Sequence, residues 1–373
     1  MSLANKHQTP VLGDFLAQEQ AALLALKQNV TRAFVTGAGG FLGKAICERL
    51  LAAGIEVTGF ARGEYPALSA MGVKMLQGDI ADERTLLDAI QGCDLVFHVA
   101  SKAGVWGSKQ SYFSPNVDGA RHIINVCKKC NIEYLVYTST PSVTFAGVDE
   151  VGNDESAPYA EKYLNFYGES KAIAEQMMLS ANGDKLTNGK LLGTTALRPH
   201  LIWGPRDPHL VPRVLERAEA GKLKLVGSED KLVDTIYVGN AAYAHILAAL
   251  TLSQNDKANQ AACAGKAYYL SNDEPITMAA MLNKILACKN LPPVTKRVPS
   301  NLAYVVGCVL ESLYGLLGKQ DEPIMTRFVA RQLSTSHYFD IGAAKRDLGY
   351  QALVSIDQGM VQLKTSLQQS RLG

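Results

Sequence analysis

The chain has 373 residues, of which 47% are hydrophobic and 19% charged, and its formal net charge is +2. This composition is typical of a globular protein with one large domain or two modest ones. A net charge near zero, without a Lys/Arg-rich run, argues against nucleic-acid binding. No stretch reaches about 18 apolar residues without a charge, so we expect no transmembrane span.

Residues 1–30 are expected to form an N-terminal extension, because the first strand begins only after them. The segment AQEQAALLALKQ at 17–28 has the pattern of a short amphipathic helix. The chain does not start with a basic segment followed by an apolar core, which argues against a signal peptide and favours a cytoplasmic protein. The seven cysteines show no pairing rhythm, so we expect free thiols, as in a reducing compartment.

From residue 31 onward, short apolar strands alternate with helical stretches. Strands are expected at 32–36, 55–60, 73–79, 94–100, 133–140 and 194–199, and helices at 42–54, 83–92, 117–130 and 170–179. Near-continuous apolar strands in such an alternation predict an α/β fold with a doubly wound parallel sheet of the Rossmann type.

This rhythm breaks after Pro199, and a helical segment near 232–252 indicates a return to the first domain. We therefore predict a nucleotide-binding domain at 31–199 plus 232–262. The remaining residues, 200–231 plus 263–373, are predicted to form a smaller C-terminal substrate lobe.

A glycine-rich turn, TGAGGFLG, joins the first strand to the first helix of this unit. Gly37 permits the tight turn, Gly40 lets the backbone approach a pyrophosphate, and Gly43 lets helix and sheet pack closely. Phe41 and Leu42 open the helix, whose free N–H groups favour a phosphate. A glycine pattern alone is a weak signal, but its place between a strand and a helix predicts dinucleotide binding.

The end of the second strand, GFARGEY, bears on which dinucleotide binds. NAD enzymes place an acidic residue on the ribose hydroxyl about 20 residues after the glycines. Ala61 stands where that acid would fall, and Arg62 beside it is suited to the 2′-phosphate of NADP(H). An ordinary exposed arginine is the alternative. We favour NADP(H).

Tyr167 and Lys171 stand four positions apart in FYGESK, a spacing that puts both side chains on one face of a helix. A lysine ammonium beside the phenol would lower the pKa of Tyr167 and make it a general acid or base. On its own the pair is more readily explained by chance than by catalysis.

The motifs together resemble those of the extended short-chain dehydrogenases/reductases over residues 31 to 250. They are TGAGGFLG, GD at 78–79, HVAS at 98–101, Asn116, YTST at 137–140, Tyr167 with Lys171, and RPHLIWGP at 198–205. The resemblance implies that Asp79 and Ile80 contact the adenine, and that Ala100, Ser101 and Pro199 line the cofactor near the nicotinamide.

The resemblance also implies catalytic roles. Tyr167 would exchange the proton, Thr140 would hydrogen-bond the substrate oxygen, and Lys171 would lower the Tyr167 pKa while holding the nicotinamide ribose. Asn116 would support the lysine. Ser139 is a neighbour that could share the role given to Thr140.

Within this group the chain is most similar to the 3β-hydroxysteroid dehydrogenase-like branch, through DTIYVGNAAYAHILAAL and HVASKAGVWGS. The closest type in that branch implies reduction of the 3-keto group of a long-chain 2-alkyl-3-oxoalkanoic acid in bacterial olefin biosynthesis. The alternatives are a 3β-hydroxysteroid or sterol-4-carboxylate dehydrogenase, a nucleotide-sugar epimerase, and a regulator that senses NADP without turnover. The retained Tyr–Lys pair argues against the regulator.

Other polar and aromatic residues carry weaker signals. His98 is expected to be structural, and His200, His209, His245 and His337 lack ligand spacing. Cys127 and Cys130 form a CxxC without a second pair, so we predict no metal. Trp106 either lines the substrate cleft or lies on a surface loop.

The run LAYVVGCVLESLYGLL at 302–317 has its leucines and valines along one broad helical face. It reads either as a core helix of the second lobe, or as the wall of an alkyl-binding cleft or a contact with lipid or a lipid-bearing partner. We also expect a homodimer.

Overall fold

A seven-stranded parallel sheet lies at the centre of the molecule. The computed structural model describes residues 9–255 and 257–369. The strand order is β12-β7-β5-β4-β1-β2-β3, and every neighbouring pair is parallel. The strands are β1 (Arg32–Thr36), β2 (Glu56–Ala61), β3 (Lys74–Gln77), β4 (Leu95–His98), β5 (Tyr134–Thr138), β7 (Gly193–Pro199) and β12 (Lys266–Leu270). The predicted doubly wound sheet is confirmed.

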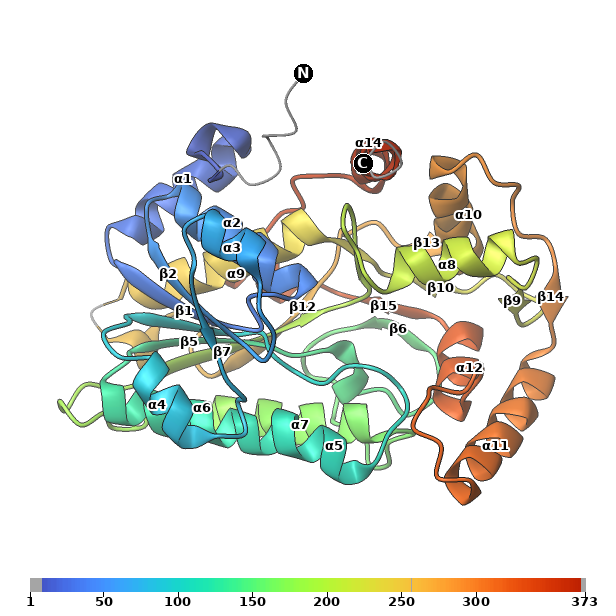
Figure 1. Cartoon of the computed structure of the whole chain (residues 1–373), viewed down its shortest axis with the longest axis horizontal. Helices are drawn as coiled ribbons and strands as arrows, with labels where there is room; N and C mark the ends of the chain where they lie inside the picture. Colours follow the sequence, from blue (N-terminus) through green and yellow to red (C-terminus); the bar gives the residue numbers. More distant parts are fainter. Residues whose placement is uncertain (1–8, 256, 370–373) are drawn as a thin grey trace.

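Helices cover both faces of this sheet (Figure 1). One face packs against α1 (Ala17–Lys27), α2 (Phe41–Ala52) and α9 (Val238–Ser253), and the other against α4 (Glu83–Ala89), α6 (Gly119–Cys130) and α7 (Phe166–Ser180). Alternate residues of a strand point to opposite faces. In β1, accordingly, Val35 belongs to the first core and Phe34 to the second.

The chain reverses its direction of travel across the sheet between β1 and β4. It runs outward from β1 to β2 and β3, and then returns to place β4 on the other side of β1. Open parallel sheets bind ligands in the crevice that such a switch point leaves at the carboxyl ends of the strands. The loops that follow β1, β2, β4, β5 and β7 therefore form the candidate site.

The outer part of the molecule is built from short strands and helices. Its four-stranded sheet has the order β13-β10-β15-β6, with the small pairs β11-β8 and β14-β9 beside it. The strands are β6 (Glu150–Asn153), β8 (Ile202–Trp203), β9 (Leu225–Val226), β10 (Leu232–Val233), β11 (Ile236–Tyr237), β13 (Ile276–Thr277), β14 (Arg297–Val298) and β15 (His337–Phe339).

The remaining helices surround these strands or join elements of the large sheet. They are α3 (Pro66–Ala70), α5 (Lys109–Phe113), α8 (Leu210–Glu219), α10 (Met278–Cys288), α11 (Ser300–Leu316), α12 (Arg327–Ser334), α13 (Gly342–Leu348) and α14 (Ile356–Gln369). No helix within residues 9–255 and 257–369 is both long and apolar enough to cross a membrane.

The sheets depart from the predicted division of the chain in two places. Residues 266–270 were assigned to the substrate lobe, but β12 pairs with β7 and forms one edge of the large sheet. Residues 232–233 were assigned to the nucleotide-binding domain, but β10 pairs with β13 and β15 of the small sheet. Both strands lie outside the regular alternation of strands and helices, so periodicity did not place them. The other predicted boundaries remain a proposal.

The predicted N-terminal extension contains α1, which packs against α9. Residues 1–8 of the extension lie outside the described residues. A buried ion pair ties α1 to α2, because Arg49 donates from Nε to Oε1 of Glu19 over 2.5 Å.

Candidate active site

The glycine-rich turn after β1 is shaped by close backbone contacts. Gly37 has φ of 67°, and a Cβ atom there would lie 2.9 Å from the backbone nitrogen of Ala100. A Cβ atom on Gly43 would lie 2.2 Å from the carbonyl oxygen of Gly37. Larger residues at these two positions would push the turn away from β4 or from α2.

The same turn leaves the N-terminus of α2 open. Gly40 is the N-cap residue and supplies no capping side chain. The N–H groups of Phe41, Leu42 and Gly43 lie in the first turn of the helix, where no intrahelical acceptor exists. Such a terminus binds phosphate through its N–H groups and its dipole.

A cavity of about 650 Å³ extends from this turn across the carboxyl ends of the strands. It is large enough for a dinucleotide by the usual size of ligand sites. Every predicted cofactor-binding residue lines it: Gly37, Gly40, Phe41, Leu42, Gly43, Arg62, Asp79, Ile80, Ala100, Ser101, Tyr167, Lys171 and Pro199. The residues present thus fit a nicotinamide dinucleotide.

The end of the cavity beside β2 and β3 carries the residues expected near the adenine and its ribose. Arg62 forms no salt bridge with any residue that the structure describes. Ile80 is buried, and the Asp79 carboxylate accepts a hydrogen bond from the backbone of Ala81 over 2.9 Å. Sequence reasoning missed Tyr65, whose ring lies against Gly39 and lines the cavity. The glycine at 39 was the available signal, because any Cβ atom there would overlap that ring.

Tyr167 and Thr140 lie together at the other end of the cavity. Tyr167 is near the start of α7, whose N-cap Asn165 accepts a hydrogen bond from Gly168 over 2.9 Å. Burial raises the pKa of Tyr167 above its ordinary value, and the hydrogen bond with Thr140 opposes this rise. The phenol is therefore protonated near neutral pH and has a proton to give.

Ser139 and Thr140 both line the cavity at the end of β5. Thr140 also accepts a hydrogen bond from the backbone of Ser142 over 3.3 Å. The Ser139 hydroxyl is buried and has no hydrogen-bond partner among the described residues. The geometry brings Thr140 to Tyr167 as predicted, and it also leaves Ser139 free to bond a substrate oxygen.

Lys171 lies one helical turn beyond Tyr167 and is fully buried. Its Nζ donates to the Thr138 carbonyl over 2.6 Å and lies 4.2 Å from the centre of the Tyr137 ring. Burial lowers the pKa of Lys171 to about 7, with Glu175 opposing the change. Burial is the largest cause of the pKa change of both groups, and the Lys171 Nζ is directed at Thr138. A lowering of the Tyr167 pKa by Lys171 stays a prediction.

Asn116 lies in a π-helical turn at Ser114–Asp118, a local distortion often found at functional sites. Its side chain exchanges hydrogen bonds with the backbone of Lys102, at 2.7 and 3.1 Å, and donates to Ser170 over 2.9 Å. It was expected to support Lys171. It ties the loop after β4 to α7 at Ser170, the residue beside the lysine, and its support of Lys171 stays a prediction.

Two buried groups behind the cavity hold these elements in place. His98 bonds to Thr36 over 2.8 Å and stacks on Tyr137, and burial next to Lys171 lowers the pKa of His98 to about 3. Glu175 and Arg198 form a fully buried ion pair of 2.6 Å between α7 and β7. Within the described ranges, no group of three or more His, Cys, Asp or Glu side chains is arranged to hold a metal ion.

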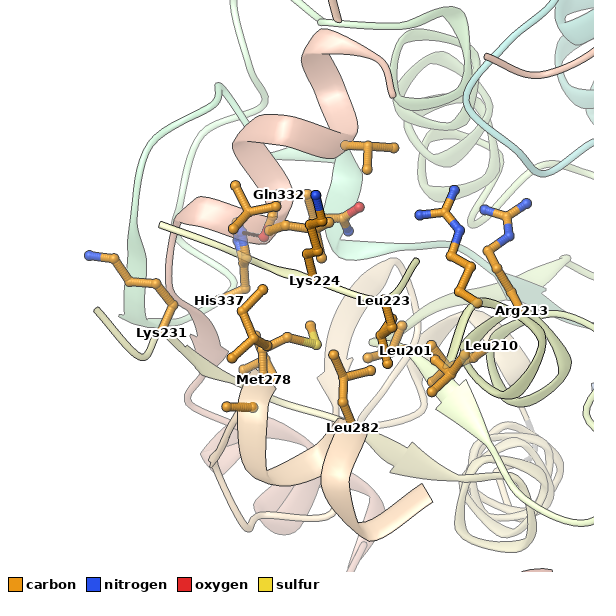
Figure 2. A pocket seen from close by; sticks show the side chains of 18 of the residues that line it. Leu201, Leu210, Arg213, Leu223, Lys224, Lys231, Met278, Leu282, Gln332 and His337 are labelled. Carbon is orange, nitrogen blue, oxygen red and sulfur yellow. Dashed lines mark hydrogen bonds between the residues drawn. The ribbon is translucent and has the colours of Figure 1, made fainter. Parts of the chain in front are cut away.

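A second cavity, of about 240 Å³, adjoins the first one at Leu201, which lines both. Figure 2 shows Leu210, Leu223, Met278 and Leu282 directed into it from α8, α10 and their neighbouring loops. Charged residues at its margin are partly neutralised, since Arg213 pairs with Glu322 over 3.1 Å. The cavity is mainly apolar and shares Leu201 with the larger cavity that holds the candidate catalytic residues.

Trp106 was expected either in the substrate cleft or on a surface loop, and residues 302–317 either in the core or along an alkyl-binding cleft. The structure shows where both lie. Trp106 lines neither cavity; its indole donates to the carbonyl of Lys319 over 3.0 Å and contacts Tyr314 edge-on. Residues 302–317, all of them described, line neither cavity and include only two buried residues, Ala303 and Gly307. The segment is thus neither a core helix nor the wall of an alkyl cleft.

Comparisons with known proteins agree with this geometry. The model of the 3-beta hydroxysteroid dehydrogenase/isomerase family matches residues 34–293. The chain is 67% identical over 352 residues to a 2-alkyl-3-oxoalkanoate reductase of Shewanella oneidensis, covering 94% of this chain and 90% of that one. It is 35% identical over 329 residues to a decarboxylating sterol-4-alpha-carboxylate 3-dehydrogenase of Mus musculus, covering 87% and 88% of the two chains.

Among solved structures, MoeE5 in complex with UDP-glucose and NAD has the same fold. The TM-score is 0.70 at 20% identity, over 91% of this chain and 99% of that one. The chain is an oxidoreductase that acts on CH–OH or C=O groups. From the matched family model and these relatives, the chain belongs to the 3-beta hydroxysteroid dehydrogenase/isomerase family.

Proposed function

We propose that this enzyme uses NADPH to reduce the 3-keto group of a long-chain 2-alkyl-3-oxoalkanoic acid to the 3-hydroxy acid, as a step of olefinic hydrocarbon biosynthesis. The observation that carries the proposal is the mainly apolar cavity that meets the catalytic cavity at Leu201. Alkyl chains gain about 0.8 kcal/mol for each methylene removed from water. The relative at 67% identity supports the same substrate class.

In this mechanism the residues of the chain orient the ketone and supply a proton. Bound NADPH supplies the hydride that adds to the carbonyl carbon. Thr140 hydrogen-bonds the carbonyl oxygen, and Tyr167 transfers its phenolic proton to that oxygen as negative charge develops there. The raised pKa of Tyr167 keeps this proton in place before reaction, which suits the reductive direction.

The residues at the two ends of the cavity hold the cofactor. Phe41, Leu42 and Gly43 would offer backbone N–H groups to the pyrophosphate, and Lys171, which lines the cavity with Tyr167, would hold the nicotinamide ribose. We propose NADPH rather than NADH because Arg62 lines the cavity without an acidic partner among the described residues, and its guanidinium suits a 2′-phosphate. Seven free cysteines support a cytoplasmic location, and a homodimer stays a prediction to be tested by sedimentation.

A cofactor-oxidation assay tests the proposal across three substrate classes. The panel contains long-chain 2-alkyl-3-keto acids, sterol 3-ketones and UDP-sugars, each with NADPH and with NADH. We expect turnover with the keto acids and NADPH. Turnover confined to sterols would favour the alternative function as a sterol dehydrogenase, which the relative at 35% identity supports.

A further inference from the structure

The proposed substrate carries a carboxylate close to the ketone that is reduced. The carboxylate carbon lies two C–C bonds from the keto carbon, each about 1.5 Å long, so both groups bind at the same end of the larger cavity. A carboxylate that leaves water needs a cation or hydrogen-bond donors in the protein. The catalytic end of the cavity must therefore supply a positive group beyond those that hold the cofactor.

Among the residues that the structure describes, four basic side chains line this cavity: Arg62, Lys102, Lys171 and His209. Arg62 follows β2 at the adenine end, and His209 is exposed at the N-terminus of α8 in the outer part. Lys171 is buried and donates to the Thr138 carbonyl. Lys102 is the fourth, and it lies in the loop after β4.

Hydrogen bonds fix the Lys102 backbone beside the catalytic helix α7. Asn116 bonds both the N–H and the carbonyl of Lys102, at 2.7 and 3.1 Å, and donates to Ser170 of α7 over 2.9 Å. Ser170 lies three residues after Tyr167 and directly before Lys171. Lys102 is thus held at the end of the cavity where the proton would be transferred.

The Lys102 ammonium has no carboxylate partner among the described residues. It donates to the Ser111 hydroxyl over 2.8 Å and lies 4.8 Å from the centre of the Tyr112 ring. A Cβ atom on Gly107 would lie only 3.1 Å from it, so the loop closes around the charge. The side chain is half-buried, and an ammonium has three donors. Two of those donors remain for a ligand.

The Tyr112 ring connects this ammonium to the proposed proton donor. Burial raises the pKa of Tyr112 to about 12, and the nearby Glu322 and Tyr167 add to this rise. The Glu322 carboxylate pairs with Arg213 over 3.1 Å, so it does not cancel the charge of the lysine. A positive charge without an acidic partner therefore lies close to the place where the keto group would react.

We propose that Lys102 binds the carboxylate of the 3-keto acid and selects the free acid over an ester or a simple ketone, a role that rests on the proposed function. The ammonium donates to a carboxylate oxygen, while Tyr167 and Thr140 bond the keto oxygen. These contacts hold both polar groups of the substrate at one end of the larger cavity. The alkyl chains are left to fill the apolar cavity that meets it at Leu201.

Kinetics with an acid and its methyl ester test this role. The probes are a short, water-soluble 2-alkyl-3-keto acid, freshly prepared from its ester, and the ester itself, which has the same ketone without the charge. The variants are Lys102→Met, which removes the ammonium, and Lys102→Arg, which keeps a cation. The matched control is Lys109→Met, because Lys109 begins α5, pairs with Glu169 over 3.0 Å and lines neither cavity.

We expect Lys102→Met to raise KM for the acid about tenfold to a hundredfold, because charge-assisted hydrogen bonds to the carboxylate are lost. Its kcat for the acid, its kinetics with the ester and its NADPH affinity should match those of wild type. Lys102→Arg should keep most of the preference for the acid, and Lys109→Met should keep all of it. Calorimetric titration with the 3-hydroxy acid product, in the presence of NADP⁺, should show the same loss of affinity without turnover.

Three results would overturn the proposal. The first is a Lys102→Met enzyme that prefers the acid as strongly as wild type does. The second is a Lys102→Met enzyme that loses NADPH affinity together with activity on both substrates, which would assign Lys102 to the cofactor. The third is an equal loss of preference in Lys109→Met, which would assign it to the general charge of this region. Failure of the wild-type enzyme to reduce either probe with NADPH would instead contradict the proposed function.

Discussion

Helices α9 and α11 are both rich in apolar residues, but α9 is mostly buried and α11 is mostly exposed. In α9, 13 of 16 residues are buried, because the helix lies against β5, β7, α1 and α2. In α11, two of 17 residues are buried, because α12 is the main element that packs against it. Similar strings of leucine, valine and alanine thus serve as core in the nucleotide-binding part and as surface in the outer part. Apolar composition indicates that a helix has an apolar face, whereas the neighbouring elements determine whether that face is buried.

The largest effect on turnover is expected at the catalytic end of the cavity in the nucleotide-binding part, called here the inner part. Tyr167→Phe removes the proton donor but keeps the ring, so turnover should fall by roughly 10²–10⁴-fold. NADPH affinity, measured by fluorescence titration, should stay nearly intact. Wild-type-like turnover would show that another group donates the proton.

Two matched substitutions, one in α9 and one in α11, measure how much a buried and an exposed side chain contribute to the free energy of unfolding. Ile246→Ala in α9 removes a fully buried side chain and should lower the free energy of unfolding by about 2–5 kcal/mol. Val309→Ala in α11 removes an exposed one and should change it by less than about 0.5 kcal/mol. Urea unfolding monitored by circular dichroism gives both values. Equal losses would mean that α11 is covered in solution.

Stability should also depend on the buried ammonium of Lys171. Its pKa is lowered to about 7 in the folded protein, from an ordinary value of 10.5. The folded state therefore carries the full cost of the buried charge below about pH 7, and the cost disappears as the pH rises towards 10.5. Lys171→Met should stabilise the protein by at most about 5 kcal/mol at low pH, and this gain should shrink with increasing pH.

Thermal unfolding of Lys171→Met and wild type across that pH range provides the measurement. Lys171→Met should also lose most of its turnover, since the lysine lies beside Tyr167 in the catalytic cavity. A gain that is independent of pH would contradict the lowered pKa.

The smallest of these effects is expected at the adenine end of the cavity. Arg62→Ala should weaken NADPH by about ten- to a hundredfold, because charge-assisted hydrogen bonds to a phosphate are lost. NADH binding should change little. Competition titrations with NADPH and NADH measure both affinities. Equal losses of affinity for the two cofactors would mean that Arg62 does not contact the 2′-phosphate.

Sequence patterns predicted the inner part of the molecule well. The glycine turn, the alternating strands and the Tyr167–Lys171 spacing are local features, and the structure brings those residues to one cavity. The sequence did not show that Asn116 would bond to Lys102 and Ser170, or that Lys171 would donate to Thr138. Those contacts join segments that are remote in the chain.

The outer part was predicted less well for the same reason. Most of its strands have two residues, too few for a period to be read, and β6 pairs with β15 across almost 190 positions of sequence. The periodicity of 302–317 correctly predicted a helix with one apolar face. Which side of that helix faces solvent depends on Gly307 and Glu311 meeting α12, a tertiary contact without a local signal.

The dependence of kcat/KM on substrate chain length tests the central claim most directly. A series of 2-alkyl-3-keto acids of increasing alkyl length is assayed with NADPH in detergent-free solution, on wild type and on Leu282→Gln, which places an amide in the apolar cavity. We predict that kcat/KM rises severalfold per added methylene until the cavity is filled, since each contributes about 0.8 kcal/mol, and that Leu282→Gln flattens the rise without weakening NADPH. Short and long chains that react equally well with the wild-type enzyme would contradict the account.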